Sequence, residues 1–179
     1  MRFAFYFCVA GVLGVSAFLA LSSPDPVATI YLYSGFLAWG FCAASVLFAW
    51  ARRRVWARRV GLAGLFFGFC HFLNFIALDK GFETIEIFSE LFRSKFIITG
   101  LISFVLLSGA GVLSLKRTQR YTKARRAFVY TAMTLASVHI FLGVKVAGVV
   151  EYFCLLVGFT LLFKSQLVSL RKTSEAKFI

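Results

Sequence analysis

The sequence predicts an all-α membrane protein, a bundle of six transmembrane helices with both termini in the cytoplasm. Two observations predict this fold class. The 179-residue chain is 60% hydrophobic with a mean hydropathy of +0.86, and a soluble domain of this size could not hide so much apolar surface. Basic segments also alternate with acidic ones along the chain, and such alternation sets the orientation of a membrane protein.

Apolar stretches with few or no charges mark the six helices, because about 20 apolar residues are needed to cross a hydrocarbon core ~30 Å thick. They cover residues 4–21, 29–50, 60–78, 96–115, 127–144 and 147–169. The first stretch has a secretory-signal alternative, since Arg2 precedes an apolar run that ends at Ser22–Ser23. It is long for the apolar region of a signal, so we expect a retained helix and a single transmembrane domain over residues 1–179.

The basic residues fix the expected orientation. They crowd into ARRRVWARR (51–59), KRTQRYTKARR (116–126) and RKTSEAK (171–177), whereas DKGFETIEIFSELFRSK (79–95) is rich in carboxylates. The positive-inside rule then predicts a multi-pass membrane protein with both termini in the cytoplasm and residues 79–95 outside. Topology and attraction to anionic membrane lipid account for the net charge of +13, so no nucleic-acid partner is expected.

The sequence lacks the common motifs of soluble catalytic chemistry. No phosphate-binding loop, HExxH or G-x-S-x-G motif is present, and no internal repeat stands out. The four cysteines form no C-x-x-C pair and fall inside the predicted helices, where they are expected to be small core residues. Any chemistry must therefore depend on other side chains within the membrane.

The chain has two histidines, His71 in GFCHFLNFIALD and His139 in ASVHIFLGVK, and both lie in apolar surroundings. An ionisable residue in a membrane helix normally faces the bundle interior and has a partner. Helical rise places His71 ~12 Å from the outer edge at Asp79, and His139 ~9 Å from the edge near Lys145. Two imidazoles at one level on separate helices could clamp a flat cofactor through its central metal.

Small residues accompany both histidines at helical spacing. They are Gly61, Gly64 and Gly68 before His71, and Ala132, Ala136 and Gly143 around His139. Such strips leave room for a macrocycle, or else allow close helix packing. With a histidine on each strip, the prediction is haem, with His71 and His139 as axial iron ligands and Gly64 and Gly68 beside the cofactor.

Other interpretations of the histidines remain open. They include an interhelical hydrogen bond, a zinc site, which lacks the usual further ligands, and a proton relay with Glu151 as its carboxylate. Lys95 and Lys145 could pair with haem propionates or serve as snorkelling anchors. A further set of cations could hold an anionic cofactor or an inner propionate, or mark topology only. These are Arg58, Arg59, Arg125 and Arg126.

Three segments carry a family resemblance: RRVGLAGLFFGFCHFLNFIALD, RSKFIITG and RRAFVYTAMTLASVHIFLGVKVAGVVEY. They resemble the membrane haem subunit of the periplasmic methionine sulfoxide reductase system (MsrQ type), of the ferric-reductase-like transmembrane group, over most of residues 50–165. The resemblance implies a six-helix b-type cytochrome of the bacterial inner membrane that passes electrons to a periplasmic molybdenum enzyme. It also matches His71 and His139 to the family's histidines on helices three and five.

One position departs from the family pattern, because Arg126 stands where the family has a further histidine at the start of helix five. A guanidinium has no lone pair to offer iron, so one haem b per chain is predicted, in the outer part of the membrane. A flavin (FMN) or quinone near the inner arginines would then carry electrons from the cytoplasmic side. A quinol that diffuses in the bilayer could instead donate directly.

The predicted function is therefore electron relay, with no substrate chemistry of the chain's own. The expected donor is a quinol or a cytoplasmic flavin reductase, and the expected acceptor is a periplasmic molybdopterin-containing reductase. Two alternatives remain. One is a ferric or other small-molecule reductase at the outer face, and the other is a non-redox structural or assembly subunit whose histidines only form hydrogen bonds.

Overall fold

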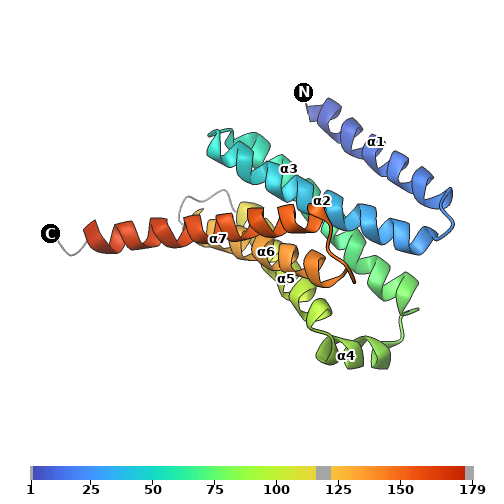
Figure 1. Ribbon diagram of the computed structural model, residues 1–179. Helices are drawn as coiled ribbons and strands as arrows, with labels where there is room; N and C mark the ends of the chain where they lie inside the picture. Colours follow the sequence, from blue (N-terminus) through green and yellow to red (C-terminus); the bar gives the residue numbers. More distant parts are fainter. Residues whose placement is uncertain (1, 116–121, 176–179) are drawn as a thin grey trace. The chain divides into compact units, whose positions relative to one another are not determined.

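A computed structural model describes residues 2–115 and 122–175 (Figure 1). The helices are α1 (Arg2–Leu21), α2 (Pro26–Trp50), α3 (Arg54–Asn74), the π-helix η1 (Phe75–Asp79), α4 (Thr84–Arg93), α5 (Lys95–Leu115), α6 (Thr122–Leu142) and α7 (Val149–Glu175). No strand occurs within these ranges, which confirms the all-α prediction. Parts of the basic segments 116–126 and 171–177 lie outside the described residues.

The chain divides into two compact units, Met1–Phe88 and Ser89–Ile179. In the first unit α2 packs against α3 to form hairpin one, and α1 contacts α2. In the second unit α5 packs against α6 to form hairpin two, and α7 contacts α6. Each hairpin carries one of the two histidines, so each is described by itself below.

Local sequence explains how hairpin one begins and turns. The Asp25 carboxylate accepts a hydrogen bond from the Ala28 backbone N–H at 3.0 Å, and Pro26 occupies the first helical position of α2. Both features favour a helix start. Between α2 and α3 the chain reverses within residues 51–53, where Arg52 takes a left-handed φ of 59°. This short connection makes α2 and α3 sequential neighbours that pack side by side.

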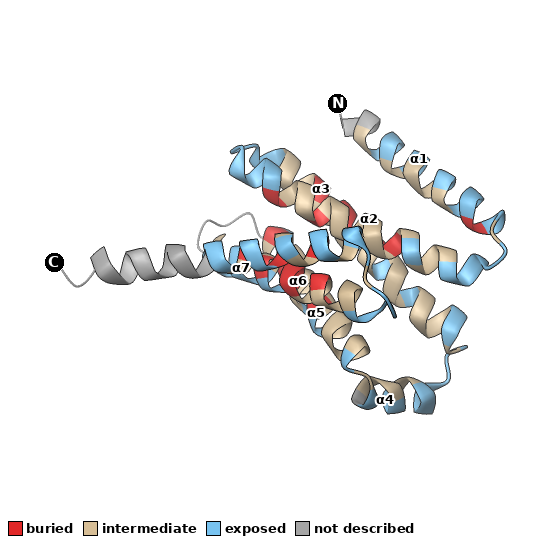
Figure 2. Cartoon of the chain, in the orientation of Figure 1, coloured by how far each residue is buried: buried red, intermediate tan, exposed pale blue. Residues whose placement is uncertain are grey.

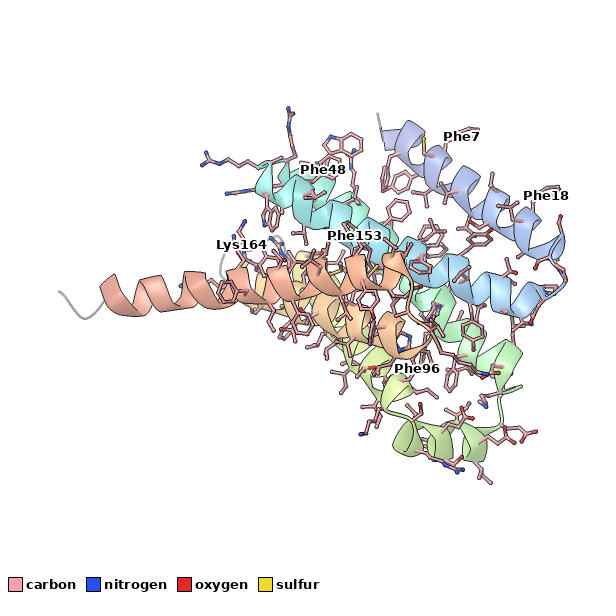
Figure 3. All side chains as sticks on the ribbon, in the orientation of Figure 1. Phe7, Phe18, Phe48, Phe96, Phe153 and Lys164 are labelled. Atoms are coloured by element: carbon pink, nitrogen blue, oxygen red, sulfur yellow. The ribbon has the colours of Figure 1, made fainter. Side chains whose placement is uncertain are left out.

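Among the residues that the structure describes, three helical segments are long and apolar enough to cross a membrane: Pro26–Trp50, Arg54–Asp79 and Lys95–Leu115. Phe5–Leu21 is a shorter apolar helix. Large apolar side chains such as Phe7, Phe18 and Phe153 are exposed, and much of the helical surface is not buried within the protein (Figures 2 and 3). Outward-facing apolar side chains suit a lipid solvent. The predicted count of six spans and the cytoplasmic termini stay predictions.

The predicted apolar stretches coincide with helices, but several helix ends differ. α3 begins at Arg54 rather than residue 60, and α6 covers Thr122–Leu142 rather than 127–144. Charged residues mark where a helix leaves lipid but do not end its hydrogen-bond ladder, so the helices extend into the basic segments. Within residues 79–95 the chain forms α4, on which Ile85 and Phe88 are exposed.

Candidate functional site

His71 lies on the last turn of α3, three residues before the helix ends at Asn74. Its Nδ1 lies 3.2 Å from the Tyr31 carbonyl oxygen and 3.2 Å from Ser34 Oγ, both on α2. The Ser34 hydroxyl donates to the Ile30 carbonyl oxygen at 2.6 Å and accepts from Asn74 Nδ2 at 3.3 Å. His71 is therefore held by a branched set of hydrogen bonds within hairpin one.

His139 occupies the corresponding place in hairpin two, three residues before α6 ends at Leu142. Its Nδ1 donates to the Phe96 carbonyl oxygen at 2.8 Å, on the first turn of α5. Thr99 Oγ1 donates to the same carbonyl oxygen at 2.8 Å. The Phe96 ring stacks on the imidazole, with ring centroids 4.1 Å apart and planes 9° from parallel. A short hydrogen bond and a stacked ring therefore both help to hold this histidine.

The hydrogen bonds define the tautomer of both imidazoles. A carbonyl oxygen only accepts, so His71 and His139 carry their proton on Nδ1 and the lone pair on Nε2. Metal-binding histidines are commonly oriented in this way, by donation from the second ring nitrogen to a backbone carbonyl. Both imidazoles therefore fit the role of an Nε2 ligand to a metal such as a haem iron.

Two glycines that the sequence interpretation missed lie against these rings. A Cβ built at Gly35 would lie 3.2 Å from Cε1 and Nδ1 of His71. A Cβ built at Gly100 would lie 2.7 Å from the same two atoms of His139. Each ring thus packs directly on the backbone of the preceding helix. A sequence signal for them exists, because YLYSG (31–35) and FIITG (96–100) share the pattern aromatic-x-x-Ser/Thr-Gly.

The predicted glycines of α3 have a clear packing environment. A Cβ built at Gly64 would lie 2.6 Å from Cys42 Sγ and 3.1 Å from the Ala38 carbonyl oxygen, so this buried residue allows close approach of α2. Gly68 is half-buried, one turn before His71. Close helix packing, the alternative left open by the sequence, applies to Gly64. A role for Gly64 and Gly68 beside a cofactor stays a prediction.

The predicted cationic residues lie near helix ends. Lys145 is exposed in the connection between α6 and α7, and Arg126 is exposed near the start of α6. The Arg59 guanidinium lies 5.5 Å from the centre of the Trp56 ring, a cation–π distance. The Nε of Arg58 is buried and has no hydrogen-bond partner among the described residues. Binding of a cofactor by these residues stays a prediction.

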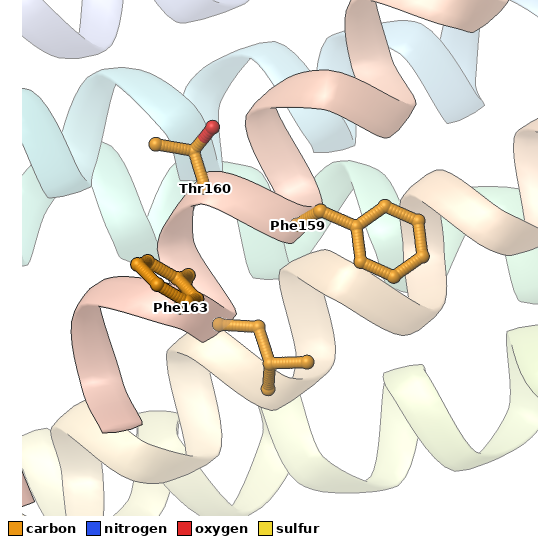
Figure 4. A pocket seen from close by; sticks show the side chains of 4 residues that line it. Phe159, Thr160 and Phe163 are labelled. Carbon is orange, nitrogen blue, oxygen red and sulfur yellow. The ribbon is translucent and has the colours of Figure 1, made fainter. Parts of the chain in front are cut away.

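A separate apolar hollow lies along α7 (Figure 4). It is lined by Phe159, Thr160, Leu162 and Phe163. The Thr160 hydroxyl donates to the Leu156 carbonyl oxygen at 2.7 Å, within its own helix. Within the described ranges, no group of three or more His, Cys, Asp or Glu side chains could hold a metal ion. The hollow therefore offers no donor set, and the two histidines remain the candidate ligands.

The apolar spans and the two histidines together define a class: helical membrane proteins whose histidines are oriented by backbone carbonyls and are suited to metal ligation. Known sequences then point to a more particular likeness. The chain is 26% identical over 151 residues to the protein-methionine-sulfoxide reductase heme-binding subunit MsrQ of Brucella ovis, covering 79% of this chain and 64% of that protein.

Other curated relatives carry the same name. MsrQ of Brucella abortus (strain 2308) shows 26% identity with the same coverage, and MsrQ of Brucella anthropi shows 28% identity over 92 residues, 49% of this chain and 42% of that protein. The chain spans less than two thirds of the length of these relatives. No family model matches the chain. No solved structure matches it either. The similarity supports a relationship to MsrQ-type subunits.

Proposed function

We propose that this protein is a membrane haem subunit that passes electrons to a protein-methionine-sulfoxide reductase. The observation that carries the proposal is that both histidines donate from Nδ1 to a backbone carbonyl, which leaves Nε2 as the ligating nitrogen. The names of the relatives, which describe heme-binding subunits of such a reductase, supply the redox system.

His71 and His139 are the axial ligands in this proposal, and they hold one haem b per chain. Bound haem supplies reversible one-electron transfer. The protein orients the two imidazoles in advance, through the carbonyls of Tyr31 and Phe96, so that little ordering remains when Nε2 binds iron. Apolar spans contact both rings: Pro26–Trp50 and Arg54–Asp79 hold His71, and Lys95–Leu115 contributes the Phe96 carbonyl to His139. Within a membrane these spans would give the low dielectric that influences a haem potential.

The proposal includes a route for electrons across the membrane. In this proposal the chain has six spans with cytoplasmic termini, the donor is a quinol in the bilayer or a cytoplasmic flavin reductase, and the acceptor is a molybdopterin-containing reductase in the periplasm. FMN or a quinone near the inner arginines would bridge the distance to an outer haem. The buried Nε of Arg58, which has no hydrogen-bond partner among the described residues, supports binding of an anionic group there.

The absorption spectrum of the full chain purified from membranes tests this function. We expect a low-spin b-type spectrum with about one haem per chain, as two imidazoles on one iron would give. His71→Ala and His139→Ala should each abolish or severely weaken it. The neighbouring changes Cys70→Ala and Val138→Ala, on the same two helices, should leave it intact.

Distinct results would contradict distinct parts of the proposal. Full haem with an unchanged spectrum in both histidine variants would refute the ligand assignment. A chain that never carries haem would favour the structural or assembly role. A haem-to-chain ratio near two would require an inner ligand other than histidine. Oxidation of the reduced chain by a ferric chelate, without transfer to the sulfoxide reductase, would favour the small-molecule reductase.

A further inference from the structure

The first turns of α2 form a small dock for His71 in the segment YLYSG (31–35). The Tyr31 carbonyl oxygen accepts from the imidazole Nδ1 at 3.2 Å. Ser34, three residues later, also donates to that carbonyl at 3.3 Å. Gly35, four residues after Tyr31, lies where its missing side chain would meet the ring. One helical turn thus supplies a carbonyl that accepts from the imidazole, a hydroxyl beside it, and a glycine surface against which the ring packs.

The first turns of α5 repeat this arrangement for His139 in FIITG (96–100). The Phe96 carbonyl accepts from Nδ1 at 2.8 Å, and Thr99, three residues later, donates to the same carbonyl at 2.8 Å. Gly100, four residues after Phe96, faces the ring. The aromatic residue, the hydroxyl and the glycine therefore keep the same offsets in both segments.

The pairing register of the helices also repeats beyond the docks. In hairpin one the Ala38 carbonyl, three residues after Gly35, approaches Gly64, seven residues before His71. In hairpin two, Ser103 is three residues after the dock glycine and Ala132 seven residues before the histidine. Ser103 Oγ donates to the Ala132 carbonyl oxygen at 2.8 Å. The shared register indicates two versions of one helix pair rather than a chance likeness of two turns.

We infer that segments 31–35 and 96–100 are two copies of one imidazole-docking element, in which Gly35 and Gly100 are positioning residues that set the plane of each histidine ring. The Gly100 copy is the stricter one, because a Cβ at 2.7 Å from ring atoms cannot be accommodated without movement. At Gly35 the corresponding distance of 3.2 Å needs a shift of only a few tenths of an ångström. A displaced ring changes the direction of Nε2 and hence its fitness as a ligand. The consequence for haem rests on the proposed function, whereas the docking geometry does not.

Nitrogen-15 NMR of labelled histidine in the haem-free full chain tests the docking directly. The chain has two histidines, so single His→Ala variants assign every ring-nitrogen signal. We expect Nδ1-protonated rings in the parent chain. Gly100→Ala should shift the His139 signals or convert part of them to another tautomer, and Gly35→Ala should shift the His71 signals less. Gly40→Ala is the matched control, since a Cβ there meets nothing within 4 Å on the same helix as Gly35.

Haem retention gives a second measurement on the same variants. Loss of an orienting contact around a ligating histidine typically weakens metal affinity by about 10- to 100-fold, so Gly100→Ala should fall in that range. Gly35→Ala should lose less than about tenfold, and Gly40→Ala should match the parent chain. Gel filtration in detergent shows whether each variant is folded.

The outcomes separate this inference from the proposed function. Identical nitrogen signals in Gly100→Ala and Gly40→Ala would overturn the docking role. If Gly100→Ala does not fold, the Gly35→Ala variant decides, and His71 signals equal to those of Gly40→Ala would overturn the inference. A parent chain that binds no haem but shows the Gly100 effect would refute the haem function and uphold the docking element.

Discussion

Hairpin one and hairpin two orient their histidines through the same offsets but differ in how each ring is held. The Tyr31 ring meets His71 edge-on, with centroids 5.4 Å apart, and the Nδ1 hydrogen bonds are 3.2 Å long. The Phe96 ring stacks flat on His139 with centroids 4.1 Å apart, and the hydrogen bond is 2.8 Å long. The Nδ1 hydrogen bonds of His71 are thus longer than that of His139, and the aromatic ring packs more closely on His139.

The two hairpins also differ in how their two helices contact each other. In hairpin one, glycines bring α3 close to α2: built Cβ atoms would lie 2.8 Å from Ser45 Oγ at Gly61 and 2.6 Å from Cys42 Sγ at Gly64. In hairpin two, the corresponding contact is a hydroxyl-to-carbonyl bond from Ser103 to Ala132. At these equivalent positions hairpin one therefore relies on close backbone packing at a glycine, whereas hairpin two uses a side-chain hydrogen bond across the helices.

The largest expected effect tests the sense in which hairpin one, which carries the His71 dock, crosses the membrane. His71 lies on the last turn of α3, eight residues before Asp79, and His139 contacts Phe96 just after residues 79–95, so the proposed topology puts both docks near the outer face. Ser89→Cys should react almost completely with a membrane-impermeant thiol reagent added from the periplasm. Arg53→Cys, in the turn at the opposite end of hairpin one, should react only after permeabilisation.

The parent chain controls for the four native thiols, of which Cys42 and Cys154 are buried. Labelling at position 89 only after permeabilisation would invert the orientation. Labelling of both variants from the periplasm would mean that hairpin one does not span the membrane.

A smaller effect should come from the close packing that distinguishes hairpin one. Gly64→Ala places a methyl group against the backbone of α2, 3.0 Å from the Cys42 nitrogen and 3.1 Å from the Ala38 oxygen. Overpacking of this kind typically costs about 1–3 kcal/mol, so the midpoint of thermal unfolding in detergent should fall by several degrees. Gly40→Ala, which meets open space, should leave the midpoint unchanged or raise it slightly.

The same experiment compares the two hairpins at equivalent positions. Ala132, seven residues before His139, already carries a methyl group and is buried. Ala132→Gly should cost about 1 kcal/mol through lost helix propensity, with no clash to relieve. Equal midpoints for Gly64→Ala and Gly40→Ala would show that close backbone packing does not stabilise hairpin one.

The sequence predicts the helices well because apolar content and charge are local properties. The all-α class and the apolar segments follow from them, as does a histidine within the apolar part of each hairpin. The start of α3 at Arg54 is missed because basic residues continue the helix beyond the apolar stretch. A strip of small residues in the sequence is compatible with both a cofactor surface and close helix packing. The structure shows that Gly64 packs against α2, and the sequence alone does not contain this contact.

The docks are missed for a different reason. YLYSG and FIITG share one identical residue, their glycine, and the pattern has meaning only once a histidine from the next helix lies against it. Pairing across some forty residues of chain is a tertiary property, and helical periodicity does not contain it. The hydrogen bonds that define the tautomers are therefore absent from any local pattern.

The smallest expected effect distinguishes the two hydroxyls of the docks, which occupy equivalent positions but act differently. Both hydroxyls donate to the carbonyl that their histidine uses, Thr99 at 2.8 Å and Ser34 at a longer 3.3 Å, but only Ser34 Oγ also accepts directly from its histidine, His71 Nδ1. A stronger Nδ1 hydrogen bond makes an imidazole a better donor to iron and favours the ferric state. Ser34→Ala should therefore raise the midpoint potential of bound haem, and Thr99→Val should lower it.

A net hydrogen bond is worth ~0.5–1.5 kcal/mol, which corresponds to shifts of roughly 20–60 mV for a one-electron couple. Spectroelectrochemical titration measures both variants against Thr160→Val, which removes a similar hydroxyl-to-carbonyl bond from α7. Opposite signs for Ser34→Ala and Thr99→Val would establish that the two docks tune their histidines differently. Shifts of the same sign, or shifts no larger than that of Thr160→Val, would contradict the assigned roles of the two hydroxyls, and the difference between the hairpins would then lie in ring packing alone.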